Sequence, residues 1–261
     1  MINTDYSIVK TFITKDIFVF DQTEKWRFVV TLRPIGDFFT DYDYSTFYNT
    51  WTNDSELKRL FKIKNANEFS SFDLFCSLVF EFGYYKEYTN IANTWVDQLK
   101  QIVPGLTIDY INKQFLIPNQ FVSAPSDAIV ATEDIWNYII YLLKVSNGEK
   151  VSPPEVFANP EDKRSYLAQK EREERIARIK MKAQQADNSK QKQAPDSLIK
   201  TFLSITYAFP SVTFDWLANQ TMAQIHWLAQ YAAGSVSYEV NSAIFAAGNM
   251  KKGSKLDFFI K

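Results

Sequence analysis

The sequence predicts a mainly α protein of the α+β class, with a helical N-terminal domain that carries one or two β-hairpins, a charged linker helix and a small all-α C-terminal module. Three observations lead to this prediction. Apolar residues recur at helical spacing, two runs of β-branched and aromatic residues flank polar turns, and a charged stretch separates two apolar regions. We therefore expect three parts, covering residues 1–158, 159–195 and 196–261.

The composition narrows the class of protein. The 261 residues include Phe 22, Tyr 14 and Trp 6, so that aromatic residues make up 16% of the chain, whereas Gly is only 7. Such a chain is neither collagen-like nor of low complexity, and it has few glycines for a phosphate-binding loop. The formal net charge is −1, so the overall field does not favour a nucleic-acid partner.

The first predicted hairpin covers residues 17–32. Its strands, Ile17–Phe20 and Lys25–Leu32, are rich in β-branched and aromatic residues, and the polar residues Asp21–Glu24 lie between them. The segment Pro34–Asp37 carries turn residues and is expected to end the second strand.

Helical spacing follows in two segments, Phe69–Phe80 and Tyr88–Ile102, the second of which stops at Val103-Pro104-Gly105. Residues 107–118 alternate around an Asn-Lys turn and predict a second hairpin. The next helix is expected to begin after Thr132 as its N-cap and to end at Asn147-Gly148.

The middle part of the chain is polar. Prolines between residues 151 and 160 mark a boundary, and residues 163–182 predict a helix with Glu–Arg pairs four residues apart. Residues 161–194 carry ten Lys and Arg against six Asp and Glu. A solvated helix is favoured over contact with nucleic acid, and residues 183–195 are expected to be a flexible linker.

The C-terminal part predicts three helices. They are expected to start at Asp196, at Thr213 and at Thr221, and the last runs toward Ala247. On this last helix Met222, Ile225, Leu228, Ala232, Val236 and Val240 would share one side.

Aromatic residues of the last helix would lie on nearly the opposite side, and two readings of them stay open. Either the helix breaks at Gly234 and both stripes fold inward, or the aromatic stripe docks onto a partner or onto the N-terminal domain. On the second reading the candidate partner-binding residues are Phe214, Trp216, Trp227, Tyr231, Tyr238, Phe245, Phe258 and Phe259.

No catalytic constellation stands out. His226 is the single histidine and is interpreted as a structural or surface residue, and the single cysteine, Cys76, as a buried small apolar side chain. Asp37, Asp41 and Asp43 have spacing that a divalent cation would tolerate, but they lack the glycine and glutamate of a calcium loop. We expect no enzyme, no cofactor and no metal, and we keep a carboxylate-based metal enzyme as an alternative.

The chain begins without the basic and apolar regions of a signal peptide, and its longest apolar runs are too short for a membrane span. The sequence therefore predicts a soluble, intracellular protein with no membrane partner.

The order of several segments resembles that of a known family. These are the helix Glu133–Leu142 with Asn147-Gly148 after it, the charged helix and Gln/Lys-rich linker, and then Asp196–Lys200, Phe209–Leu217, Thr221–Ile225 and Gly248–Lys252. Over residues 105–261 this layout is similar to the tail assembly chaperones of long-tailed bacteriophages that infect Gram-positive hosts. Residues 1–104 share only the general character.

The resemblance implies a non-enzymatic assembly factor in the host cytoplasm. Such proteins coat the tape measure protein, and a C-terminal extension, often made by a ribosomal frameshift, is thought to recruit tail tube subunits. The extension would begin within residues 183–195. The expected partners are the tape measure protein and the tail tube protein, and assembly into a homo-oligomer stays open. The alternative is a structural baseplate or tail component that is retained in the virion.

Overall fold

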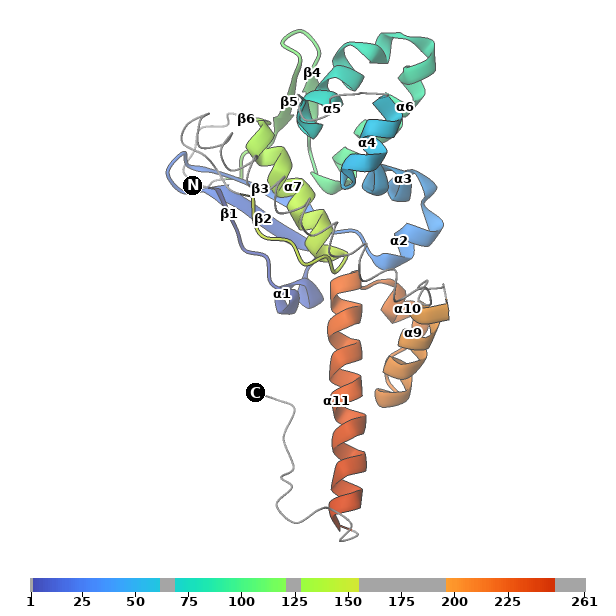
Figure 1. Ribbon diagram of the computed structural model, residues 1–261. Coiled ribbons are helices and arrows are strands. Elements are labelled where there is room, and N and C mark those ends of the chain that lie inside the picture. Colours follow the sequence, from blue (N-terminus) through green and yellow to red (C-terminus); the bar gives the residue numbers. More distant parts are fainter. Residues whose placement is uncertain (1, 62–68, 121–127, 155–195, 247–261) are drawn as a thin grey trace, which may run out of the picture. The chain divides into compact units, whose positions relative to one another are not determined.

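The computed structural model describes residues 2–61, 69–120, 128–154 and 196–246 of the chain. It confirms the predicted class, because the described residues are mainly helical and form two small antiparallel sheets of three strands each (Figure 1). In this described part no helix is both long enough and apolar enough to cross a membrane.

The first sheet contains the predicted hairpin and one strand more. The strands β2 (Asp16–Asp21) and β3 (Trp26–Thr31) pair in antiparallel fashion from Asp16 opposite Thr31 to Asp21 opposite Trp26. The short strand β1 (Ile2–Thr4), which the sequence analysis missed, pairs with the other edge of β2. The side chains of β2 alternate between buried and more exposed, as expected for a sheet that packs on a core with one face.

The second sheet is built in the same way. The strands β4 (Thr107–Asp109) and β5 (Gln114–Ile117) form the second predicted hairpin, and the two-residue strand β6 (Ile129–Val130) pairs with β5. The two sheets are connected through the edge of β3, where Gln120 N–H donates to Arg27 O at 2.6 Å and Asn119 Oδ1 accepts from Arg27 N–H at 3.1 Å.

Both hairpins turn without glycine and use the same device. Asp21 Oδ1 accepts hydrogen bonds from the backbone N–H groups of Thr23 and Glu24, and Lys25 has a φ of 54°. Asp109 and Lys113 repeat this arrangement, since Asp109 Oδ1 accepts from two backbone N–H groups and Lys113 also has a φ of 54°. The aspartate satisfies the turn's donors, so a chain poor in glycine can still turn tightly.

The helices of the N-terminal part follow the predicted pattern where the pattern was strong. The described helices are α1 (Ile8–Ile13), α2 (Ile35–Thr40), α3 (Tyr42–Trp51), α4 (Asp54–Phe61), α5 (Ser71–Phe80), α6 (Lys86–Ile102) and α7 (Glu133–Ser146). The α5, α6 and α7 helices were predicted, and Thr132 caps α7 by accepting the N–H of Ile135, as expected. The helices α1, α2 and α4 were not predicted, and the residues of α3 were not distinguished from a loop.

The C-terminal part contains α9 (Asp196–Ala208), α10 (Phe214–Ala218) and α11 (Met222–Ala246). All three were predicted, and Thr213 caps α10 by accepting the N–H of Trp216. Of the two open readings, the one in which the last helix breaks at Gly234 is excluded, because α11 continues through this residue. A single glycine inside a helix costs about 1 kcal/mol relative to alanine, which a 25-residue helix can absorb.

The predicted charged helix and linker, residues 159–195, lie outside the described residues. Contacts group Met1–Pro154 with the residues from Phe202 onward in one compact unit. The expected division into parts at 1–158, 159–195 and 196–261 stays a prediction.

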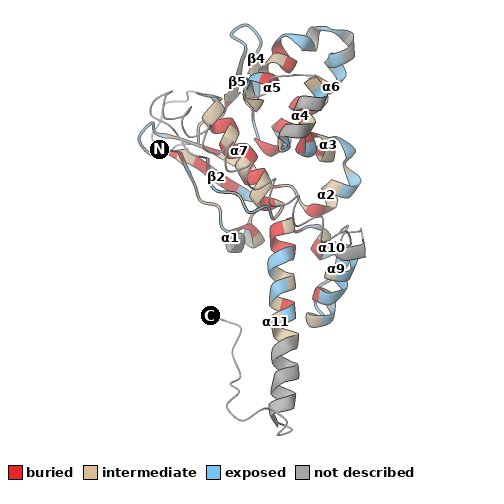
Figure 2. Ribbon diagram, viewed as in Figure 1, coloured by how far each residue is buried: buried red, intermediate tan, exposed pale blue. Residues whose placement is uncertain are grey.

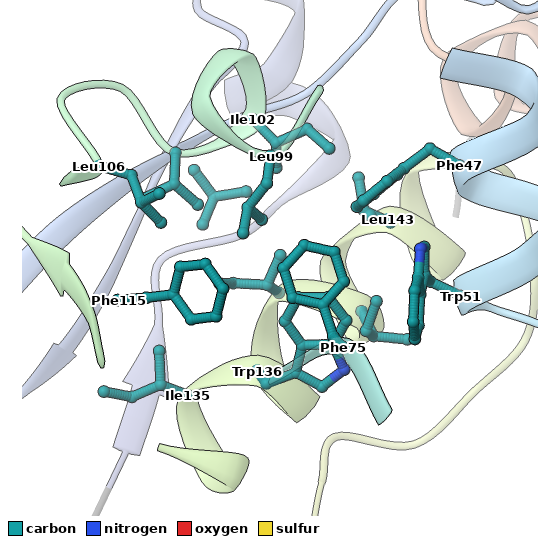
Figure 3. Packing of buried hydrophobic residues seen from close by; sticks show 14 of the residues in the cluster. Phe47, Trp51, Phe75, Leu99, Ile102, Leu106, Phe115, Ile135, Trp136 and Leu143 are labelled. Atoms are coloured by element: carbon teal, nitrogen blue, oxygen red, sulfur yellow. The ribbon is translucent and has the colours of Figure 1, made fainter. Parts of the chain in front are cut away.

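The core of the N-terminal part is a cluster of interlocked aromatic rings (Figure 3). The Trp51 ring meets the rings of Phe75, Trp95 and Trp136 at centroid distances of 5.0, 5.3 and 5.8 Å, each nearly perpendicular. Phe75 also stacks on Trp136 at 4.8 Å. These contacts connect α3, α5, α6 and α7, and Trp136 Nε1 donates to Ser71 Oγ at 2.9 Å, which satisfies the indole.

We predict that Phe75→Ala lowers the free energy of unfolding by about 3–5 kcal/mol, because the ring is fully buried among aromatic neighbours and its loss leaves a cavity. Urea unfolding followed by circular dichroism measures this change. The control is Phe39→Ala, which removes an exposed ring and is expected to change stability by about 0.5 kcal/mol or less. Similar losses for both variants would contradict the proposed core.

Candidate partner-binding surface

The helices α10 and α11, called the arm below, are attached to the N-terminal part at the turn between them. The backbone N–H of Ile35, at the start of α2, donates to Gln220 O at 2.7 Å. Gln224 is 0% exposed, and its Nε2 donates to Thr11 Oγ1 of α1 at 2.9 Å. These bonds place the first turn of α11 against α1 and α2.

The Gln224 side chain also caps its own helix. Its Oε1 accepts the N–H of Thr221 at 2.6 Å, and Thr221 Oγ1 accepts the N–H of Gln224 at 3.4 Å. This reciprocal pair is a capping box of the type Thr-x-x-Gln. The side-chain amide of Gln224 therefore caps the start of α11 and also donates the hydrogen bond to α1.

Two glycines allow the arm to approach closely. A Cβ on Gly36 of α2 would lie 2.9 Å from Ala218 O, at the end of α10. Gly148 follows the C-cap of α7 with a φ of +79°, and a Cβ there would lie 2.7 Å from His226 Nδ1 of α11. A side chain at position 36 would meet the backbone of Ala218 and push the arm away from α2, whereas one at position 148 would strain the left-handed backbone and displace the His226 side chain.

The helix α2 and the segment after α7, which the arm contacts, are held in place by contacts within the N-terminal part. Tyr48 OH of α3 donates to Glu149 Oε1 at 2.6 Å, which fixes the segment next to Gly148. Burial first, and then the hydrogen bond to Glu149, raise the pKa of Tyr48, so it remains a neutral donor. Phe38 of α2 packs on Tyr44 and Tyr48 at centroid distances of 5.5 and 5.0 Å.

A partly exposed set of aromatic rings covers the attachment site of the arm. Its members, called the aromatic surface below, are Phe12, Phe209, Trp216, Trp227 and Tyr231. The Phe12 ring of α1 stacks on Trp216 at 6.4 Å and meets the edge of Trp227 at 5.5 Å. Tyr231 continues the surface, since it stacks between Trp227 at 5.6 Å and Phe209 at 5.8 Å.

These rings remain accessible although they touch one another. Trp216 and Trp227 are 41% and 40% exposed, whereas Leu217 and Ile225 next to them in sequence are fully buried. Figure 2 shows most of the buried residues of α11 in its first turns, where it meets the N-terminal part. Large rings held in place by stacking and open to solvent are good anchors for a protein partner.

The structure places four of the eight predicted partner-binding residues. Trp216, Trp227 and Tyr231 belong to the aromatic surface, and Phe214 is exposed but packs on Phe202 of α9 at 5.8 Å. The backbone at Tyr238 and Phe245 belongs to α11, but their side chains are not described. Phe258 and Phe259 lie outside the described residues.

Two members of the aromatic surface were missed by the sequence analysis. Phe209 was not singled out as a candidate partner-binding residue, and Phe12 lies in a short helix that was not predicted. The run Ile8–Ile13 mixes β-branched and basic residues, so its pattern alone gives no sign that Phe12 faces the arm.

The α9 helix presents a second apolar stripe. Ile199, Leu203 and Tyr207 follow one another at four-residue spacing, and all three are exposed, Tyr207 by 81%. Ile205 is fully buried on another side of the same helix. The helix is thus apolar on the side that packs and on a side that faces solvent.

Arg33 pairs with two of the three aspartates that were considered for a metal site. Arg33 Nε donates to Asp37 Oδ2 at 2.6 Å, and Arg33 Nη2 donates to Asp41 Oδ2 at 3.0 Å. Burial raises the pKa of Asp41, but the Tyr44 N–H and the Arg33 charge outweigh it and hold that pKa below its usual value. Among the described residues no group of three or more His, Cys, Asp and Glu side chains is arranged to hold a metal ion.

Neither Cys76 nor His226, the two residues considered for nucleophilic chemistry, is a member of the aromatic surface. Burial and the nearby Asp73 raise the pKa of Cys76 to about 11, so the half-buried thiol stays protonated at neutral pH. His226 is exposed and lies against Gly148.

We predict that Gln224→Leu weakens the attachment of α11. The change leaves the buried N–H of Thr221 without its acceptor and removes the donor to Thr11, which costs about 1–3 kcal/mol. Hydrogen exchange at Ile225 N–H, which donates to Thr221 O, measures the free energy of opening. The control Gln230→Leu alters an exposed position of the same helix, and an equal effect there would rule out the buried amide as the cause.

Comparisons of the chain with protein-family models, with curated proteins and with solved structures found no match. What the protein binds has to follow from the chemistry of its own surface.

Proposed function

We propose that the protein is a non-enzymatic tail assembly chaperone of a long-tailed bacteriophage, acting in the host cytoplasm. It would bind the tape measure protein through the aromatic surface and recruit tail tube subunits. This assignment departs from what the resemblance implies, because Trp216 and Trp227 of that surface lie in the C-terminal extension that is thought to recruit tube subunits. The observation that carries the proposal is the aromatic surface itself, in which Phe12, Trp216 and Trp227 are fixed by mutual stacking and yet remain partly open to solvent.

The chemistry of this surface suits the proposed partner. A tape measure protein is a long helical chain with apolar faces that need cover before the tube forms around it. Rings that are already held in place lose little conformational freedom on binding, so more of the contact energy appears as affinity. Tryptophan and tyrosine are the side chains most often found at the energetic centre of protein interfaces.

A second apolar surface fits the second part of the proposal. The stripe Ile199, Leu203 and Tyr207 on α9 is exposed and shares no residue with the aromatic surface. A protein that holds two partners at once brings them to a high local concentration without further contacts. We propose this stripe as the contact for tail tube subunits.

The proposal is tested by co-expression with the tape measure protein encoded beside it. We expect the native chain to keep the tape measure protein soluble, and the variant Trp216→Ala/Trp227→Ala to weaken the complex about thirtyfold, as the loss of an interface hot spot would. Pull-down and calorimetry measure the change, and circular dichroism checks the fold of the variant.

The matched control is Phe39→Ala/Tyr42→Ala, which removes two exposed rings on α2 and α3 and is expected to leave binding unchanged. A tape measure protein that stays insoluble beside the native chain would overturn the proposal, as would equal losses from both double variants. Mass spectrometry of purified particles separates the alternative, because a baseplate or tail component would be present in stoichiometric amounts.

A further inference from the structure

The arm is packed outside the main core. The continuous cluster of buried apolar residues in the described chain runs from Ile2 to Leu143 and includes no residue of the arm. The arm has buried apolar residues of its own, among them Leu217, Ile225 and Ala232, but they do not join this cluster. Loss of the arm's contacts would therefore leave the aromatic core of the N-terminal part intact.

The joint between the arm and the N-terminal part is rich in polar groups. Thr11, Gln220, Thr221 and Gln224 are all buried there. The hydrogen bonds Ile35 N–H to Gln220 O and Gln224 Nε2 to Thr11 Oγ1 cross the joint. Water can replace such bonds when the surfaces separate, so a polar joint opens at a lower cost than an apolar one of the same area.

The aromatic surface draws its rings from both sides of this joint. Phe12 belongs to α1, whereas Trp216 and Trp227 belong to the arm. Opening of the joint would separate Phe12 from both tryptophans. The surface is complete only while the arm is docked.

We propose that the arm docks reversibly on α1, α2 and the end of α7, and that docking switches the aromatic surface between a complete, binding-competent state and a split one. The partner binds the docked state more tightly, and by linkage the bound partner holds the arm closed. The proposal that the arm opens depends only on the contacts at the joint. The proposed effect of opening on the partner rests on the proposed function.

The backbone offers a direct reporter of docking. The Ile35 N–H donates across the joint to Gln220 O, while Leu32 N–H, three residues earlier, donates to Lys15 O within the N-terminal part. An arm that opens exposes the first amide and leaves the second protected. We expect hydrogen exchange by NMR to be at least tenfold faster at Ile35 than at Leu32, after correction for intrinsic rates.

The close approach at Gly36 allows the joint to be locked. A Cβ at position 36 would lie 3.5 Å from the Cβ of Ala218, within the range that a disulfide bridges. In the full-length variant Gly36→Cys/Ala218→Cys the disulfide holds the arm closed against the contact between the new Cβ and Ala218 O, and reduction frees the arm. The native Cys76, with its pKa raised to about 11, reacts slowly at pH 8 and interferes little.

We expect the oxidised variant to exchange Ile35 N–H at least tenfold more slowly than the same variant after reduction, with Leu32 N–H unchanged. A second variant, Gly36→Ala, is expected to accelerate exchange at Ile35 alone, since its methyl group meets Ala218 O. Equal exchange at Ile35 in both redox states, or parallel changes at Leu32, would each overturn reversible docking, and so would equal exchange at Ile35 and Leu32 in the native chain, which carries no added Cβ.

Binding of the tape measure protein to the same variant tests the second part of the proposal, the coupling between docking and partner binding. The oxidised form is expected to bind at least fivefold more tightly than the reduced form. Equal affinities would overturn the coupling while leaving the proposed function standing. An absence of binding in both forms, and in the native chain, would overturn the proposed function and the coupling together, while the exchange measurements still decide the docking.

Discussion

The packing of Trp51 against Phe75, Trp95 and Trp136 is the interaction on which the rest of the structure depends. It joins four helices that have no hydrogen-bonded sheet to hold them together, and the buried residues of the two small sheets belong to the same core cluster. The cluster fixes α3 and α7, and these in turn carry Tyr48 and Gly148 to the place where the arm docks. A change at the centre of the core would therefore also be felt at the joint.

The aromatic surface follows from the same excess of aromatic residues. The interior accommodates the rings that interlock around Trp51, and other large rings remain for the exterior. Phe12, Trp216 and Trp227 are not scattered over that exterior but touch one another across two segments far apart in sequence. Scattered exposed apolar residues are normal for a soluble protein, whereas a connected group marks a contact site.

Much of the fold could be predicted because its signals are local. Thr132 and Thr213 cap their helices as the sequence indicates, and both hairpins form where polar turns separate β-branched runs. The strands β1 and β6 were missed because two or three residues carry no detectable alternation, and their pairing depends on partners distant in the chain.

The aromatic surface could be predicted only in part, because helical spacing is a local signal whereas contacts between distant segments are not. The aromatic stripe with Trp227 and Tyr231 could be read from helical spacing, but its contact with Phe12 could not, since about 200 residues separate them in sequence. The roles of Gly36 and Gly148 also depend on tertiary approach, because a close contact with Ala218 or His226 leaves no trace in the surrounding sequence.

The central claim, that the aromatic surface holds the tape measure protein, is tested most directly by site-specific photocrosslinking in infected cells. A photoreactive phenylalanine analogue at position 227 would lie in the surface, and the same analogue at exposed position 42 would lie outside it. The account predicts a crosslink to the tape measure protein from position 227 and none from position 42. Equal crosslinking from the two positions, or none to the tape measure protein from position 227, would contradict it.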